Sequence, residues 1–210
     1  QASWVDRCRA DSFFHILTLE PELAVGDEFV QLYTHAATLC PADTLLHLCF
    51  VDRVAYALQS AYCAQFTADV QALQVTGVPL IFQRSAAAWH THPRNYRALE
   101  EMVTVVGEGY FQRTLDFAWC HLVVQAGQLQ AILPQIKRHD LAICAELVLL
   151  LAESIKLRAV DWLAWEDPFI LGRDPHQLKQ EREQSPAETQ KRLAYLLPML
   201  EAMHQAVSHA

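Results

Sequence analysis

Short apolar runs alternate with longer segments of helical periodicity along most of this chain. Each run is bounded by Pro, Gly or acidic residues and is too short for a buried helix, so it predicts a strand. The five predicted strands are residues 13–19, 45–51, 79–83, 114–119 and 159–165. Strands that alternate with helices at this interval are typical of βαβ units, which build parallel sheets. The sequence therefore predicts an α/β fold, with a mainly parallel sheet and helices on both faces.

Apolar residues recur at helical spacing between these runs. The predicted helices are residues 27–40, 53–74, 94–111, 122–137 and 141–156. Residues 86–93 are expected to form an irregular loop, because Pro93 restricts the residue before it to extended geometry. The stretch from Trp89 to Arg97 is polar and lacks apolar periodicity, so we expect it to be more mobile than its surroundings.

The composition changes after residue 172, where the chain becomes more polar. Ser185, Pro186 and Glu188 fit a capped helix start, and they precede a predicted amphipathic helix at 186–207. We therefore divide the chain into an α/β domain, residues 1–172, and a C-terminal helical extension, residues 173–210. The apolar side of this helix is a candidate docking surface for a protein partner.

Composition restricts the kinds of ligand that the protein can bind. The chain has 210 residues, of which 52% are hydrophobic, and a formal net charge of −8. This acidic balance argues against a general nucleic-acid binder, which needs a basic face, but it permits a small phosphorylated ligand. No apolar run reaches the ~18 residues of a membrane span, and the charged N-terminus does not resemble a signal peptide. The six cysteines form no CxxC pair or zinc-site spacing, which predicts reduced thiols and a cytosolic location.

Charged or polar side chains follow four of the predicted strands at the point where the strand ends. They are Asp52-Arg53, Arg84-Ser85, Cys120-His121 and Glu166-Asp167. Ligands of open parallel sheets bind beyond the carboxyl ends of the strands. We therefore expect Asp52, Arg84 and Asp167 to open into one cleft at this edge.

Three stretches resemble a GT-A-fold glycosyltransferase of the family-2 type. The resemblance spans roughly residues 13–172 and is carried by Leu48–Asp52 with Leu80–Ser85, by Asp116–Leu122, and by Ala145–Leu150 with Val160–Trp162 and Trp165–Pro168. The chain departs from the family pattern at two positions. Val54 stands where the family's metal motif has its second acid, and His121 stands where a glycine follows the cysteine.

The resemblance implies transfer of a sugar from a nucleotide-sugar donor to an acceptor. It implies that Asp52 holds Mn²⁺ or Mg²⁺ and that Arg84, with His92 and Arg94 from the following basic cluster, binds the donor's phosphates. Glu146 and Asp167 are then the candidates for the base that activates the acceptor.

Each candidate also has a purely structural interpretation. Asp52 fits a helix cap, and the cluster around Arg84 fits a solvated loop. Glu146 fits an ion pair with a nearby Lys or Arg, and Asp167 fits a polar turn. The alternative function is therefore a non-catalytic α/β interaction domain, a degenerate relative of such enzymes.

Overall fold

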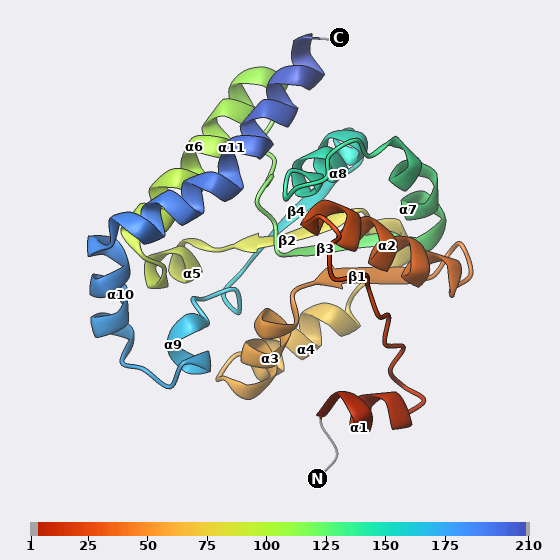
Figure 1. Ribbon diagram of the computed structural model, residues 1–210, viewed down its shortest axis with the longest axis horizontal. Coiled ribbons are helices and arrows are strands. Elements are labelled where there is room, and N and C mark those ends of the chain that lie inside the picture. The colour runs from red at the N-terminus through yellow and green to blue at the C-terminus, as the bar shows by residue number, and fades with distance from the viewer. Residues whose placement is uncertain (1–3, 209–210) are drawn as a thin grey trace.

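A four-stranded sheet lies at the centre of the computed structural model, which describes residues 4–208 (Figure 1). Its strands, in spatial order β1-β3-β2-β4, are β1 (Leu45–Cys49), β3 (His121–Gln125), β2 (Leu80–Arg84) and β4 (Lys156–Val160). The helices are α1 (Trp4–Ala10), α2 (Val25–Thr38), α3 (Val51–Gln59), α4 (Cys63–Gln71), α5 (Ala86–Thr91), α6 (Arg94–Phe111), α7 (Ala126–Ile132), α8 (Ile143–Leu151), α9 (Asp167–Ile170), α10 (Pro175–Gln184) and α11 (Pro186–Ser208). Two short 3₁₀ turns are η1 (Val75–Gly77) and η2 (Leu133–Gln135). The α/β class is confirmed.

The prediction of a mainly parallel sheet is wrong, because β3 runs against both of its neighbours. β3 is antiparallel to β1 and to β2, and only the β2–β4 pair is parallel. A helix between two strands does not fix the direction of the second strand; the connection after the helix does. Residues 112–120 return the chain to the carboxyl end of β2, where Arg84 Nη2 lies 3.5 Å from Cys120 Sγ. β1, β2 and β4 nevertheless share one direction, so their carboxyl ends meet at one edge.

Two of the five predicted strands lie close to where they were expected, and three do not. β1 and β2 fall within or beside 45–51 and 79–83. Residues 13–19 form no strand, and Phe13 is 82% exposed. Residues 114–119 form an irregular segment whose apolar side chains are buried without strand pairing, and β3 begins after it. The last strand lies at 156–160 rather than 159–165. Apolar burial alone therefore does not distinguish an extended strand from a packed loop.

Two of the helix predictions agree with the structure over nearly their full length. The prediction for 94–111 matches α6, and 186–207 matches α11. The helix predicted at 53–74 is divided at Ser60, whose Oγ accepts a hydrogen bond from the Tyr62 amide at 3.2 Å and so competes with the helical pattern. The irregular loop predicted at 86–93 is wrong. Ser85 caps α5 there, since its Oγ accepts from the Ala88 amide at 3.1 Å.

The two faces of the sheet are covered by different helices. On one face, α2, α6, α7, α8 and α11 enclose the larger core, which includes Phe117, Trp119 and Met203. On the other face, α3 and α4 pack with Phe82 and Trp162. Helices on both faces, as predicted, leave the strand ends as the accessible part of the sheet.

The C-terminal extension packs on the rest of the chain. α11 runs beside α6 in Figure 1, and its residues Leu196, Met199, Ala202 and Met203 belong to the larger core. The apolar side that suggested a docking surface therefore packs largely within the chain itself, although Leu197 is exposed. No helix among residues 4–208 has the combined length and apolar character needed to cross a membrane.

Candidate functional site

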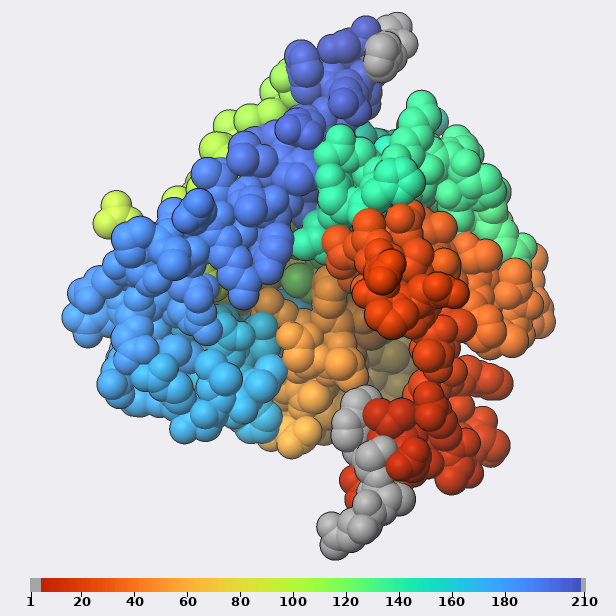
Figure 2. All heavy atoms as spheres, viewed as in Figure 1, coloured from red at the N-terminus to blue at the C-terminus, as the bar shows by residue number. Residues whose placement is uncertain are grey.

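A cavity of about 340 Å³ opens at the edge where β1 and β2 end and β3 begins. One wall is charged and consists of Asp52, Arg53, Arg84, Glu100 and Arg192. The rest of the lining is largely apolar and includes Phe50, Trp119, Leu141, Cys144, Leu196 and Met199. We call this space the arginine cavity. In Figure 2 the surface is hollowed where the blue α11 faces the orange α3.

Arg84 is fixed at the base of the arginine cavity. Its Nη1 donates to Glu100 Oε2 at 2.9 Å, and its Nε donates to His92 Nε2 at 3.2 Å. The guanidinium also lies over the Trp89 ring, 4.6 Å from its centroid. Burial acts to lower the pKa of Arg84, but Glu100, Cys120 and Asp116 together raise the pKa above its usual value. Arg84 is therefore a permanent, rigidly held cation.

His92 is a buried acceptor for Arg84. Its Nδ1 lies 3.0 Å from the Ala88 carbonyl oxygen, so Nδ1 carries the proton and Nε2 accepts from Arg84. Burial and then the charge of Arg84 lower the pKa of His92 well below its usual value, which keeps the ring neutral. His92 thus orients Arg84 and does not itself line the cavity.

Glu100 connects Arg84 to the C-terminal helix. Its Oε1 lies 3.4 Å from Arg192 Nη1, and Arg192 lies over the Tyr96 ring at 4.2 Å from the centroid. The sequence pattern held a signal for Glu100 that the analysis missed. Tyr96, Glu100, Val103 and Gly107 lie on one buried stripe of α6, where a carboxylate requires a partner.

Asp52 and Arg53 reach the cavity from the first turn of α3. Asp52 is exposed, and its Oδ1 accepts from the Arg53 amide at 2.9 Å. The Arg53 guanidinium forms an ion pair with Glu166, whose side chain is buried. Arg53 therefore links α3 to the segment after β4.

Asp167 lies beside a second, polar cavity of about 230 Å³ that we call the adjoining cavity. Arg192 and Tyr195 line both cavities, so they form the partition between them. Asp167 Oδ2 lies 3.7 Å from Arg182 Nη2. The structure thus brings Asp52 and Arg84 to one cavity and Asp167 to its neighbour.

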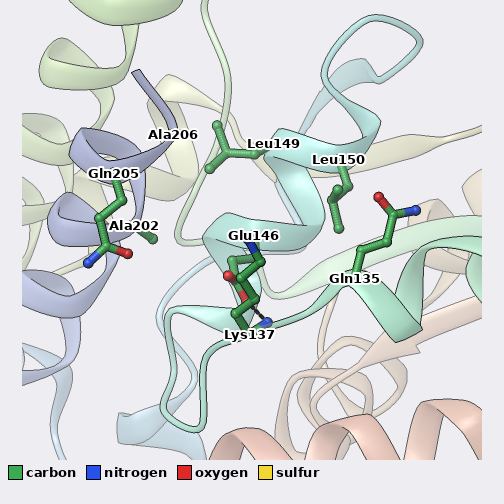
Figure 3. Close-up of a pocket in the computed structure, with 8 residues that line it drawn as sticks. All are labelled: Gln135, Lys137, Glu146, Leu149, Leu150, Ala202, Gln205 and Ala206. Carbon is green, nitrogen blue, oxygen red and sulfur yellow. Dashed lines mark hydrogen bonds between the residues drawn. The ribbon is translucent and has the colours of Figure 1, made fainter. Parts of the chain in front are cut away.

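Glu146 and Arg94 lie outside both cavities. Glu146 Oε2 accepts from the Lys137 and Arg138 amides at 3.0 and 2.9 Å, and it lines a separate cavity with Leu149 and Ala202 (Figure 3). These amides, and not the ion pair considered from the sequence, satisfy its charge. Arg94 is exposed at the start of α6, where its amide donates to Glu183 Oε1 at 2.7 Å. The segment Trp89–Arg97 spans the end of α5 and the start of α6, and its His92 is 2% exposed.

The residues around Asp52 do not fit a dedicated Mn²⁺ or Mg²⁺ site. Such cations need several oxygen ligands. Within residues 4–208, Asp52 belongs to no group of three His, Cys, Asp or Glu side chains placed to share an ion. Its neighbours in the cavity wall include three arginines, which repel a cation. A different group of three potential metal ligands is formed by His47, Cys49 and His121, which offer nitrogen and sulfur rather than oxygen. It was not predicted from the sequence, although His47-x-Cys49 on a strand places both side chains on one face.

Comparison of the chain with models of known protein families, with curated proteins and with solved structures found no match.

Proposed function

We propose that the arginine cavity binds a phosphorylated small molecule, with a nucleotide sugar as the ligand class, and that the protein is a glycosyltransferase. The observation that carries this proposal is the meeting of Arg53, Arg84 and Arg192, from three different elements, in one cavity with an apolar wall. Arginine is the preferred side chain for phosphate oxygens, and small-molecule sites combine apolar walls with a few polar groups.

The three arginines differ in their freedom to contact a ligand. Arg84 is held by Glu100 and His92 and supplies a fixed positive charge at the base. Arg53 is paired with Glu166. The side chain of Arg192 is 26% exposed, and it reaches a phosphate by giving up its ion pair with Glu100 and its contact with the Tyr96 ring. Together they would stabilise the charge that develops on a departing diphosphate without a metal ion.

The two cavities offer separate places for donor and acceptor. The arginine cavity, near the lower end of the range of about 300–1,000 Å³ for small-molecule sites, suits a diphosphate and one ring. The adjoining cavity is polar and contains Asp167, which is the candidate base for an acceptor hydroxyl. Glu146, satisfied by two amides beside a separate cavity, is the weaker candidate.

Ligand binding is tested by calorimetry and thermal shift with UDP- and GDP-sugars, with and without Mn²⁺. We expect binding that does not need Mn²⁺.

Arg192→Gln should weaken sugar-nucleotide binding by about 10- to 100-fold, as expected for loss of a charged hydrogen bond. Arg192→Lys should restore part of this affinity. The control is Arg158→Gln on β4, which lines neither cavity. If binding requires Mn²⁺ and Asp52→Asn abolishes this Mn²⁺-dependent binding, Asp52 is the metal ligand that the family resemblance implies.

Catalysis is tested separately by measuring sugar release and transfer. Asp167→Asn should lower kcat by about 100-fold or more and leave donor affinity unchanged, because it removes the base and no phosphate contact. Unchanged turnover in this variant would exclude Asp167 as the base.

The second candidate is a non-catalytic interaction domain. It is favoured by the internal pairing of Arg84 with Glu100 and of Arg53 with Glu166, which stabilises the fold without any ligand. Absence of binding to every sugar nucleotide and sugar phosphate would support this candidate and refute the transferase.

A further inference from the structure

The three side chains His47, Cys49 and His121 form a compact cluster on one face of the sheet. Their potential ligand atoms all lie within 4.8 Å of one another. His47 Nε2 and His121 Nδ1 are 2.9 Å apart. We propose that this cluster is a zinc site with two imidazole ligands and one thiolate, and that a fourth coordination position is open to solvent.

The pairing of β1 with β3 produces this geometry. Cys49 and His121 are direct partners across the antiparallel pair, so their side chains leave the sheet on the same face. His47 lies two residues before Cys49 on β1 and shares that face. The arrangement therefore rests on strand register, which is more rigid than a loop.

The distances match the needs of tetrahedral zinc. Zn–N bonds of about 2.0–2.1 Å and Zn–S bonds of about 2.3 Å place neighbouring ligand atoms roughly 3.3–3.6 Å apart. The observed imidazole separation of 2.9 Å and the cluster limit of 4.8 Å need only small side-chain movements to reach these values. The metal would replace the hydrogen bond between the two rings.

The ring of His121 is held firmly beside its neighbours in the cluster. His121 is fully buried, and its Nδ1, the nitrogen available to the metal, faces His47 Nε2 at 2.9 Å. Its ring packs edge-on against Trp162 at 4.9 Å between centroids, and the His47 ring lies 5.9 Å from that of Phe82. Imidazoles among aromatic rings are costly to bury when their nitrogens are not satisfied.

The chemistry of the ligands selects the metal. Nitrogen and sulfur ligands favour Zn²⁺ over Mn²⁺ and Mg²⁺, which prefer oxygen. Cys49 is exposed, so an ion can reach the site from solvent and keep an open position. This site would be separate from the phosphate chemistry proposed for the arginine cavity and does not depend on it.

The test uses the full chain after treatment with a chelator. Titration with Co²⁺, a spectroscopic substitute for Zn²⁺, should give one equivalent of binding and a thiolate-to-cobalt charge-transfer band. Zn²⁺ added to a chromophoric competitor gives the affinity. We expect Cys49→Ser to abolish the band and His47→Gln to weaken zinc binding at least about tenfold. Cys63→Ser, at a partly buried thiol on α4 outside the cluster, is the matched control and should bind zinc normally.

Two results would overturn the proposal. The first is a parent protein that gives no charge-transfer band and binds no zinc, in which case the two rings are a metal-free hydrogen-bonded pair. The second is a band of equal intensity in Cys49→Ser, which would place the bound ion on another thiol. His47 is partly buried and Cys49 is exposed, so His47→Gln and Cys49→Ser are expected to fold. Circular dichroism can confirm this before metal is added.

Discussion

The arginine cavity and the His47–Cys49–His121 cluster lie at the same edge of the sheet but satisfy their polar groups in different ways. Around Arg84, the buried charges pair with one another: Glu100 contacts both Arg84 and Arg192. In the histidine cluster, the two rings contact each other, and three potential metal-ligand atoms lie within 4.8 Å of one another. The first arrangement is complete without a ligand and should contribute to stability. The second consists of metal-ligand side chains and should respond strongly to a metal.

The largest effect is expected from breaking the ion pair at the base of the arginine cavity. Glu100→Leu leaves the buried Arg84 without its carboxylate partner, and loss of one member of a buried pair costs about 3–5 kcal/mol. Denaturant unfolding measures the change. Glu101→Leu, at the exposed neighbouring position of α6, is the control and should change stability by less than about 0.5 kcal/mol. If Glu100→Leu lowers the free energy of unfolding only slightly, the Arg84–Glu100 ion pair does not contribute to the stability of the fold.

A smaller effect is expected from the packing of α6 that positions Glu100. A Cβ at Gly107 would overlap the Phe117 ring, whereas one at Gly109 meets nothing within 4 Å. Gly107→Ala should therefore lose about 1–3 kcal/mol through overpacking. Gly109→Ala should gain about 0.5–1 kcal/mol through helix propensity. Thermal unfolding of the two variants checks the contrast, and equal effects would mean that α6 is not fixed against the loop 112–120.

The pH dependence should report on Asp116, beneath the same ion pair. Burial raises the pKa of Asp116 to about 6, partly offset by Arg84. Because the folded pKa lies above the unfolded one, the carboxyl favours the fold at low pH, and this contribution is lost as the pH rises from about 4 to 6. Asp116→Asn should then be more stable than the parent above pH 6 by about 2–3 kcal/mol, with the difference becoming small near pH 4.

Denaturant unfolding of the parent and of Asp116→Asn between pH 4 and 8 gives the difference in their free energies of unfolding. The amide of Ala118 donates to Asp116 Oδ1 at 3.1 Å, and the Asn side chain retains an oxygen to accept this bond. A difference independent of pH would show that Asp116 titrates normally.

The smallest effect is expected in the histidine cluster without metal. Cys49 is exposed, so Cys49→Ser should change the stability of the metal-free protein by less than about 0.5 kcal/mol. With Zn²⁺ at 100 times the dissociation constant, the parent should gain about 2.7 kcal/mol and the variant much less. Thermal unfolding with zinc and with chelator gives both values. If Zn²⁺ stabilises the parent and Cys49→Ser equally, the histidine cluster is not the region that responds to metal.

The sequence by itself determined the α/β class, the bounds of α6 and α11, and the placing of charged residues after β1, β2 and β4. These are local properties, because helical periodicity and the ends of apolar runs depend on residues that are close together in the sequence. The prediction placed Asp52, Arg84 and Asp167 in one cleft. Asp52 and Arg84 do line one cavity, since β1 and β2 keep one direction, but Asp167 lines the neighbouring cavity.

Only the tertiary structure decided the reversal of β3 and the groups that it assembles. Strand direction depends on where the returning loop packs, and burial of Leu115, Phe117 and Trp119 fixes residues 112–120. That reversal places His121 opposite Cys49 and Cys120 beside Arg84. Glu100 and Arg192 meet because α11 packs on α6 across more than 90 residues of chain. Such contacts arise from long-range packing, whose free energy is not encoded in any short pattern.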